Sequence, residues 1–212
     1  MTRTVTIIDY GMGNLSSVAN ALAHLGTDSL ISSNPKDLRG AKALILPGVG
    51  AFGQAMQNLK NMNLVDEMSR QVLENKKPFL GICLGMQLIA EDSEELGFNK
   101  GLGWIEGHVR KIPVTDGLRL PHIGWNNIHV TQTCPLFDGI KKDMNFYFVH
   151  SFQVECEGNW NVAHTDYGVS VTAAIRKENI FATQFHPEKS HENGLTLLKN
   201  FMEYTQRCSS TA

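Results

Sequence analysis

The first half of the chain alternates short runs of apolar and β-branched residues with stretches of helical periodicity. Runs at 5–8, 43–46 and 79–82 indicate buried strands, and the stretches at 15–25 and 51–77 place apolar residues every three or four positions. Strands that alternate with helices in this way are typical of βαβ units, which form a parallel sheet with helices on its faces. The pattern predicts an α/β fold with an open, mostly parallel sheet.

The pattern of the sequence changes after Gly97. Short β-rich segments separated by turn residues indicate antiparallel strands added to the sheet, at 104–112, 118–130, 145–155, 161–166, 169–176 and 180–185. A final helix is expected over 195–204. We expect residues 1–205 to form a single domain, followed by a frayed polar tail at 206–212.

Two of the expected helices lead to specific predictions. Gly26 is a good stop for the first helix, because glycine favours the backbone conformation that ends helices. The stretch 51–77 is expected to be helical and to bury five apolar side chains, which are Met56, Leu59, Leu64, Met68 and Leu73.

Charge and composition exclude several classes of function. The chain of 212 residues has 19 Lys and Arg against 21 Asp and Glu, a net charge of −2, so it has no basic footprint for nucleic acid or a membrane surface. No apolar run approaches the roughly 20 residues of a membrane span, and the first residues lack the apolar core of a signal peptide. We expect a cytoplasmic protein.

Four cysteines stand at positions 83, 134, 156 and 208. None forms a Cys-x-x-Cys pair, and the chain is large for a disulfide scaffold, so reduced thiols are expected and no zinc spacing is present. No metal or cofactor is expected.

Cys83 lies in the sequence Gly81-Ile82-Cys83-Leu84-Gly85, between an expected strand and an expected helix. A nucleophile elbow needs this pattern, because its turn is so tight that the positions two before and two after the nucleophile must lack side chains. The helix N-terminus beneath the sulfur favours the thiolate form. A buried structural cysteine is the alternative, but the paired glycines favour a nucleophile.

A thiol that attacks an amide needs a general base, and His186 is the best placed of eight histidines. It follows the last expected strand, and Glu188 stands two residues later, where an extended backbone points both side chains the same way. Cys83, His186 and Glu188 therefore form a candidate triad. A lone His-Pro-Glu is more often a loop cap, so this prediction depends on the cysteine elbow.

Pro47-Gly48-Val49-Gly50 directly follows another expected strand. It is either an ordinary turn or a place where backbone N–H groups approach a ligand at the carboxyl ends of parallel strands. The second interpretation would supply donors to an oxyanion.

These three motifs together resemble the class I (triad) glutamine amidotransferases. Three further stretches, 9–15, 121–126 and 147–152, are similar to one branch of that family, the glutaminase subunits of imidazole glycerol phosphate synthase. The resemblance runs from residue 5 to about 204 and implies a flavodoxin-like core. It also implies hydrolysis of glutamine to glutamate and ammonia, with the ammonia passed to a (β/α)₈-barrel cyclase subunit in a heterodimer. That cyclase makes imidazole glycerol phosphate and aminoimidazole carboxamide ribotide in histidine biosynthesis.

The resemblance also assigns roles to residues. Cys83 would form the thioester, His186 would move the proton and Glu188 would orient it, while Val49 and Leu84 would supply the oxyanion donors. Positions that match the glutamine-binding residues are Gly48, Gly50, Gln87, His150, Ser151 and Phe152. Positions expected at the partner interface are Asn14, Trp125 and Lys189. The family's oxyanion loop can face the wrong way until the partner is bound, so the isolated chain is expected to be a poor glutaminase.

Alternatives remain open at several of these positions. Trp125 is either a core residue or a partner contact, and Lys189 is either a solvated charge or an anchor for the partner. His122, His129 and His164 are expected to be structural. At the level of function, the alternatives are a paralogous glutaminase that supplies ammonia to aminate a surface-polysaccharide sugar, and a non-catalytic scaffold that docks to a barrel.

Overall fold

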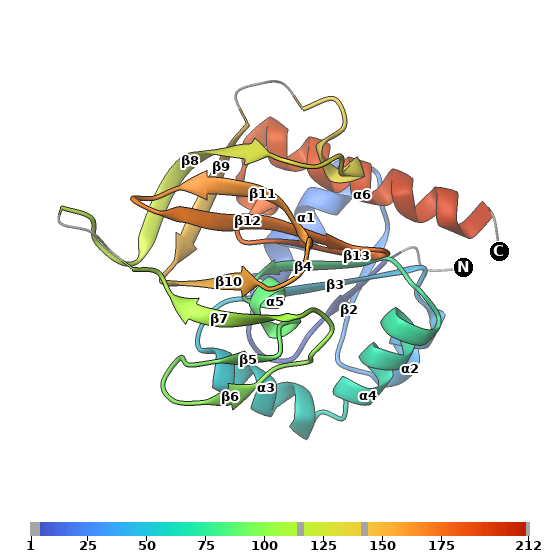
Figure 1. The fold of residues 1–212 in the computed structure, drawn as a ribbon. Coiled ribbons are helices and arrows are strands. Elements are labelled where there is room, and N and C mark those ends of the chain that lie inside the picture. Colours follow the sequence, from blue (N-terminus) through green and yellow to red (C-terminus); the bar gives the residue numbers. More distant parts are fainter. Residues whose placement is uncertain (1–4, 114–116, 141–143, 211–212) are drawn as a thin grey trace.

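The computed structural model describes residues 5–113, 117–140 and 144–210 (Figure 1). Its strands are β1 (Val5–Ile8), β2 (Ser29–Ser32), β3 (Ala43–Gly48), β4 (Phe79–Cys83), β5 (Asp92–Ser93), β6 (Asn99–Lys100), β7 (Gly107–Lys111), β8 (His122–Val130), β9 (Asn145–His150), β10 (Phe152–Cys156), β11 (Asn161–Asp166), β12 (Ser170–Lys177) and β13 (Ile180–Thr183). Its helices are α1 (Leu15–His24), α2 (Pro35–Gly40), α3 (Phe52–Asn61), α4 (Val65–Ser69), α5 (Leu84–Leu88) and α6 (His191–Ser210). A π-helical turn, η1 (Arg70–Glu74), and two 3-10 turns, η2 (Pro135–Phe137) and η3 (Pro187–Lys189), complete the elements.

A nine-stranded sheet in the order β2-β1-β3-β4-β13-β12-β11-β8-β9 forms the centre of the molecule. The first five strands in this order pair in parallel, and the remaining pairs are antiparallel. The predicted fold class, a mostly parallel α/β sheet with added antiparallel strands, is therefore confirmed. The register places Gly48, at the end of β3, beside Cys83, at the end of β4, which brings two of the predicted motifs to one sheet edge.

Helices cover both faces of this sheet (Figure 1). On one face, α1 and α6 bury side chains such as Leu22 and Phe201 in a common core cluster. On the other face, α2 to α5 bury a second cluster that includes Phe52 and Met86. The first helix ends as predicted: Gly26 adopts a φ of +71°, and the N–H groups of Gly26 and Thr27 bond back to the last turn.

A second sheet of four strands, in the order β10-β7-β5-β6, packs beside the first. Segments 104–112 and 145–155 were expected to join the central sheet, and this expectation is wrong for two parts of them. The strand of the first segment, β7, belongs to the small sheet, and the second segment divides at Ser151 into β9 in the large sheet and β10 in the small one. The chain crosses between sheets at the residues predicted to bind substrate.

The long helix expected over 51–77 is interrupted. Asn63 adopts a φ of +54°, and the N–H groups of Asn63 and Leu64 bond to the carbonyls of Lys60 and Leu59, which is a Schellman stop. Helix α4 and the π-helical turn η1 follow. Four of the five expected inward side chains are buried, but Leu73 is 39% exposed, because the wider π turn rotates it outward.

Two elements, β2 and α2, lie in a stretch for which no structure was predicted. The expectation of a frayed tail is wrong for residues 206–210, which continue α6, and residues 211–212 lie outside the described part. In the part of the chain that the structure describes, no helix is long and apolar enough to cross a membrane.

Candidate active site

Cys83 sits on a sharp bend between β4 and α5, with φ 55° and ψ −107°. The two flanking glycines explain how the bend packs. A Cβ on Gly85 would lie 1.8 Å from the carbonyl oxygen of Leu46, and a Cβ on Gly81 would lie 2.7 Å from the carbonyl oxygen of Gly85. Both distances are far below normal contact, so the strand-to-helix turn excludes any side chain at these positions, as a nucleophile elbow requires.

A pocket of about 290 Å³ opens at Cys83; we call it the Cys83 pocket. Eight of the predicted site residues line it: Val49, Gly50, Cys83, Leu84, Gln87, His150, Ser151 and Phe152. They come from the end of β3, the elbow and the crossing from β9 to β10. The pocket therefore brings together the nucleophile, both predicted oxyanion positions and five of the six predicted glutamine-binding positions.

His186 and Glu188 lie next to this pocket, inside the protein. The Nδ1 atom of His186 is 2.8 Å from Oε1 of Glu188, and their side chains are only 2% and 1% exposed. The backbone of His186 is fixed on two sides, since its N–H donates to the carbonyl of Tyr147 and its carbonyl accepts from the Ser190 hydroxyl. The carboxylate thus accepts a hydrogen bond from Nδ1–H, which leaves Nε2 as the reactive nitrogen.

The electrostatics of this group favour a charged imidazole. Burial opposes the charge, but interactions with the Cys83 thiol and the Glu188 carboxylate outweigh it and raise the pKa of His186 to about 10. Nε2 of His186 makes no hydrogen bond to the described residues. The Cys83 sulfur instead lies 3.9 Å from the carbonyl oxygen of Val149 and 3.8 Å from Nε2 of Gln184. The thiol is close to its predicted base and is held by two other groups.

The remaining predicted residues lie outside the pocket. Gly48 lies beneath it, where a Cβ would be 2.1 Å from the Tyr10 hydroxyl. Trp125 is 44% exposed and stacks on His191 at 4.8 Å between ring centroids, so it is not a core residue. Lys189 is exposed, with Nζ 5.7 Å from the centre of the Tyr147 ring, and Asn14 is half-buried just before α1. Their roles at an interface remain predictions.

Two polar residues at the site were not identified from the sequence. Glu95 lines the pocket, and its carboxylate accepts a hydrogen bond of 2.7 Å from the N–H of Phe52. Gln184 is fully buried and contacts the nucleophile. Glu95 stands in an acidic loop with no motif. Gln184 falls inside the strand expected over 180–185, and its place two positions before His186 is the one signal that could have found it.

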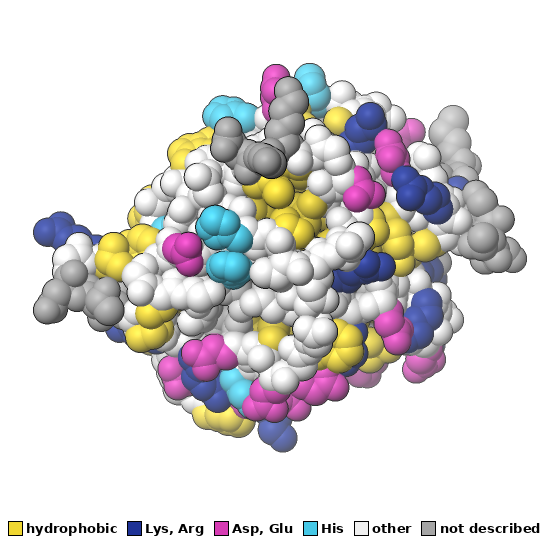
Figure 2. Space-filling model, turned by 45° about the horizontal axis from the view of Figure 1, so that its top comes forward, with side chains coloured by type: hydrophobic (Ala, Val, Ile, Leu, Met, Phe, Trp, Pro, Cys, Tyr) yellow, Lys and Arg dark blue, Asp and Glu magenta, His cyan; other side chains and the backbone are white. Residues whose placement is uncertain are grey.

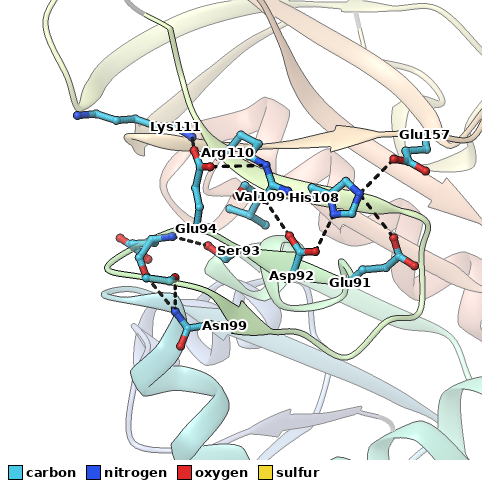
Figure 3. Close-up of polar contacts among 12 residues, drawn as sticks. Glu91, Asp92, Ser93, Glu94, Asn99, His108, Val109, Arg110, Lys111 and Glu157 are labelled. Carbon is cyan, nitrogen blue, oxygen red and sulfur yellow. Dashed lines mark hydrogen bonds and ion pairs between the residues drawn. The ribbon is translucent and has the colours of Figure 1, made fainter.

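A second polar cluster lies on the small sheet (Figure 3). Nδ1 of His108 is 2.9 Å from Asp92, and Nε2 is 3.1 Å from Glu157 and 3.9 Å from Glu91. The ligand atoms of Glu91, His108 and Glu157 all lie within 4.8 Å of one another, close enough to hold a metal ion. Burial lowers the pKa of His108, but the interactions with Asp92 and Glu157 outweigh burial and raise it. A protonated His108 therefore balances the negative charge of the surrounding carboxylates. Acidic side chains also gather along the lower edge of Figure 2.

The chain matches known proteins over nearly its whole length. Residues 6–204 match the family model described as glutamine amidotransferase class-I. The chain is 49% identical to "Imidazole glycerol phosphate synthase subunit HisH 1" of Campylobacter jejuni (strain RM1221), with 93% of this chain and 98% of that one covered. It is 46% identical to subunit HisH 2 of Vibrio vulnificus (strain YJ016), with 95% of each chain covered. A chain from the solved structure of PurLQS from Thermotoga maritima has the same fold, with a TM-score of 0.74 at 18% identity over 96% of this chain and 99% of that one.

Proposed function

Because this chain belongs to the class I glutamine amidotransferases and, among them, to the HisH subunits of imidazole glycerol phosphate synthase, we propose that its Cys83 pocket hydrolyses glutamine to supply ammonia to the partner subunit of that synthase. The observation that carries the proposal is the convergence of Cys83, His186 and Glu188 beside a pocket of about 290 Å³, near the lower end of the ~300–1,000 Å³ range of small-molecule sites.

The chemistry follows from the positions of the groups. The Cys83 sulfur attacks the side-chain carbonyl carbon of glutamine, and His186 passes the thiol proton to the departing nitrogen, which leaves as ammonia. Water then attacks the thioester, His186 takes a proton from the water and returns it to the sulfur, and glutamate is released. Glu188 accepts a hydrogen bond from Nδ1–H of His186 throughout and keeps Nε2 facing the reaction.

The pocket also supplies groups for the rest of the substrate. Backbone N–H groups at Val49 and Leu84 are the proposed oxyanion donors. The Glu95 carboxylate is the acidic side chain that lines the pocket, and it would pair with the α-ammonium group of glutamine. The Ser151–Phe152 backbone, which also lines the pocket, would bind the α-carboxylate.

The partner is proposed to be a cyclase subunit of (β/α)₈-barrel fold that forms a heterodimer with this chain. An exposed strip of Trp125, Ile123 and Lys189 is the proposed contact, since Trp125 and Ile123 are 44% and 59% exposed although they are large and apolar. Burying such side chains is a common source of binding energy at interfaces. Delivering ammonia inside a complex also keeps it from being protonated by bulk water.

The test is glutamate release by the purified chain with and without the histidine-pathway cyclase. Activity that rises on addition of the cyclase, together with conversion of glutamine nitrogen into imidazole glycerol phosphate, supports the proposal. Cys83→Ala should abolish synthesis from glutamine and leave synthesis from added ammonium salt intact. Loss of both would contradict the division of labour between the subunits.

A second candidate function is a paralogous glutaminase that supplies ammonia to aminate a surface-polysaccharide sugar. Two relatives carry numbers in their names, HisH 1 and HisH 2, although both are named as subunits of imidazole glycerol phosphate synthase. Activation by a sugar-aminating partner and not by the histidine cyclase would select this alternative.

A further inference from the structure

A chain of hydrogen bonds runs from β8 to the wall of the Cys83 pocket. Nδ2 of Asn126 is 3.3 Å from Nε2 of His122, and Nδ1 of His122 is 3.0 Å from Nε2 of His150. Nδ1 of His150 is in turn 2.8 Å from the carbonyl oxygen of Phe152. His122 and His150 face each other directly in the register of β8 and β9, so the sheet itself sets the spacing of the two rings.

The direction of every bond in this chain is determined by its last member. A carbonyl only accepts, so Nδ1 of His150 must carry a proton, and Nε2 of a neutral His150 must be an acceptor. Nδ1 of His122 then donates to it, which leaves Nε2 of His122 to accept from the Asn126 amide. Both rings are thereby held in the Nδ1-protonated tautomer.

The surroundings keep both rings neutral and fixed. Burial lowers the pKa of His122 and of His150 to about 4, so neither is charged at neutral pH. His122 is stacked between Phe148, at 4.8 Å between ring centroids, and Tyr167, at 4.1 Å. Nothing in this arrangement lets His122 rotate without breaking a stack and two hydrogen bonds.

The Phe152 carbonyl connects this chain to the nucleophile. It also accepts a hydrogen bond of 3.1 Å from Nε2 of Gln87, which lies 3.2 Å from Oε1 of Gln184. Nε2 of Gln184 is the group 3.8 Å from the Cys83 sulfur. One carbonyl in the pocket wall is therefore held from two sides, by the histidine pair and by the glutamines that reach the thiol.

We propose that His122 is a positioning residue for glutamine binding: its Nδ1–H fixes the tautomer of His150, which holds the Phe152 carbonyl and with it the Ser151–Phe152 wall of the pocket. This inference rests on the proposed function. His122 does not line the pocket and acts only through His150. It also starts the strand that carries Trp125 and Asn126, so the proposed partner surface and the pocket wall share one rigid connection.

The variants that test this proposal separate stacking from hydrogen bonding. His122→Phe keeps a flat ring between Phe148 and Tyr167 but removes the donor, whereas His122→Gln restores an amide that donates. With the cyclase partner present, we expect His122→Phe to raise KM for glutamine about tenfold, the cost of one unsatisfied buried acceptor, with kcat within about threefold of the wild type. His122→Gln should recover most of the loss. His129→Phe, at an exposed position of the same strand, is the matched control and should leave KM unchanged.

Specific outcomes of the same experiment would overturn the proposal. A folded His122→Phe enzyme with wild-type KM, or with a loss confined to kcat, would overturn the proposal. So would a His122→Gln enzyme no better than His122→Phe. Synthesis from ammonium salt in the same complex should be unaffected in every variant, and a loss there would mean general disruption of the complex and contradict a local positioning role.

A second measurement uses the wild-type chain, so it does not depend on whether a variant folds. In the full chain labelled with ¹⁵N-histidine, long-range ¹H–¹⁵N spectra at pH 7 should show His122 and His150 as neutral Nδ1-protonated rings. An Nε2-protonated or charged form of either ring would overturn the proposal. Because this measurement is independent of catalysis, absence of glutaminase activity would contradict the proposed function while the spectra still decide the hydrogen-bond chain.

Discussion

Nδ1 of His186 lies 2.8 Å from Oε1 of Glu188, and the two side chains are buried together at the end of β13, beside the Cys83 pocket. A buried carboxylate and a buried imidazole at this distance are joined by one hydrogen bond, which keeps a proton on the ring nitrogen away from the nucleophile. The other ring nitrogen therefore faces the thiol. The triad is assembled by one sheet edge, since β4 and β13 are parallel neighbours.

Removing the base, His186, and removing the residue that orients it, Glu188, should lower kcat by different amounts. His186→Ala should lower kcat by roughly 10²–10⁴-fold, the usual contribution of a general acid and base. Glu188→Gln should lower kcat clearly less, because an amide oxygen still accepts the hydrogen bond from Nδ1–H, although the lost charge lowers the pKa of His186. Steady-state glutamate release with the partner subunit measures both, and a larger loss in Glu188→Gln would contradict these roles.

The elbow should tolerate no side chain at Gly85. A Cβ there would lie 1.8 Å from the Leu46 carbonyl oxygen in β3, so Gly85→Ala must push the helix away from the sheet and should cost about 3 kcal/mol or more of unfolding free energy. Gly40→Ala is the matched control, since nothing lies within 4 Å of its added Cβ. Urea unfolding of both variants makes the comparison, and equal midpoints would show that the turn is not constrained as described.

The small sheet should lose stability as pH rises. The pKa of His108 is raised above its ordinary value of 6.5, so the stabilisation it provides is complete below pH 6.5 and is lost as pH rises through the raised value. For a partly exposed cluster the effect should be about 0.5–1 kcal/mol. His108→Gln should remove that part of the pH dependence when urea midpoints are compared at pH 6 and pH 8.5. An unchanged pH dependence in the variant would mean that His108 is not the responsible group.

Tyr10 carries a buried hydroxyl that makes no hydrogen bond to the described residues, directly beneath Gly48. Tyr10→Phe removes an unsatisfied polar group while keeping the ring, so it should raise the free energy of unfolding by about 1 kcal/mol. Tyr167→Phe provides the contrast, because the Tyr167 hydroxyl donates to the Arg119 carbonyl at 2.6 Å and its loss should bring no gain. A destabilised Tyr10→Phe variant would reveal a partner for that hydroxyl.

The parts of the fold that could be predicted are those determined by residues close together in the sequence. The glycines around Cys83 serve a turn of five residues, and Gly26 ends its helix through bonds within one turn, so a short stretch of sequence specifies each. The break at Asn63 is also local, because asparagine is a known residue at helix ends, but the apolar periodicity continues through it and masks the signal.

The parts that could not be predicted depend on contacts between distant residues. The crossing at Ser151 from one sheet to the other is determined by which strands pair. The β-rich sequence over 145–155 shows no break at that residue. Glu95 and Gln184 reach the site from separate elements and belong to no motif. His122 lies in the recognised stretch 121–126, but its link to the pocket wall runs through His150 on another strand. His122 was expected to be structural, and its hydrogen bond to His150 is the observation on which its proposed positioning role rests.

The central claim is that Cys83 is the nucleophile, and its covalent labelling tests this most directly. A glutamine-mimicking diazo ketone should alkylate the full chain once, in the presence of its partner, and peptide mass spectrometry should place the adduct on Cys83. The same treatment should leave Cys134, Cys156 and Cys208 unmodified and should be strongly slowed in His186→Ala. An adduct on another cysteine, or none while glutamine is still hydrolysed, would contradict the assignment.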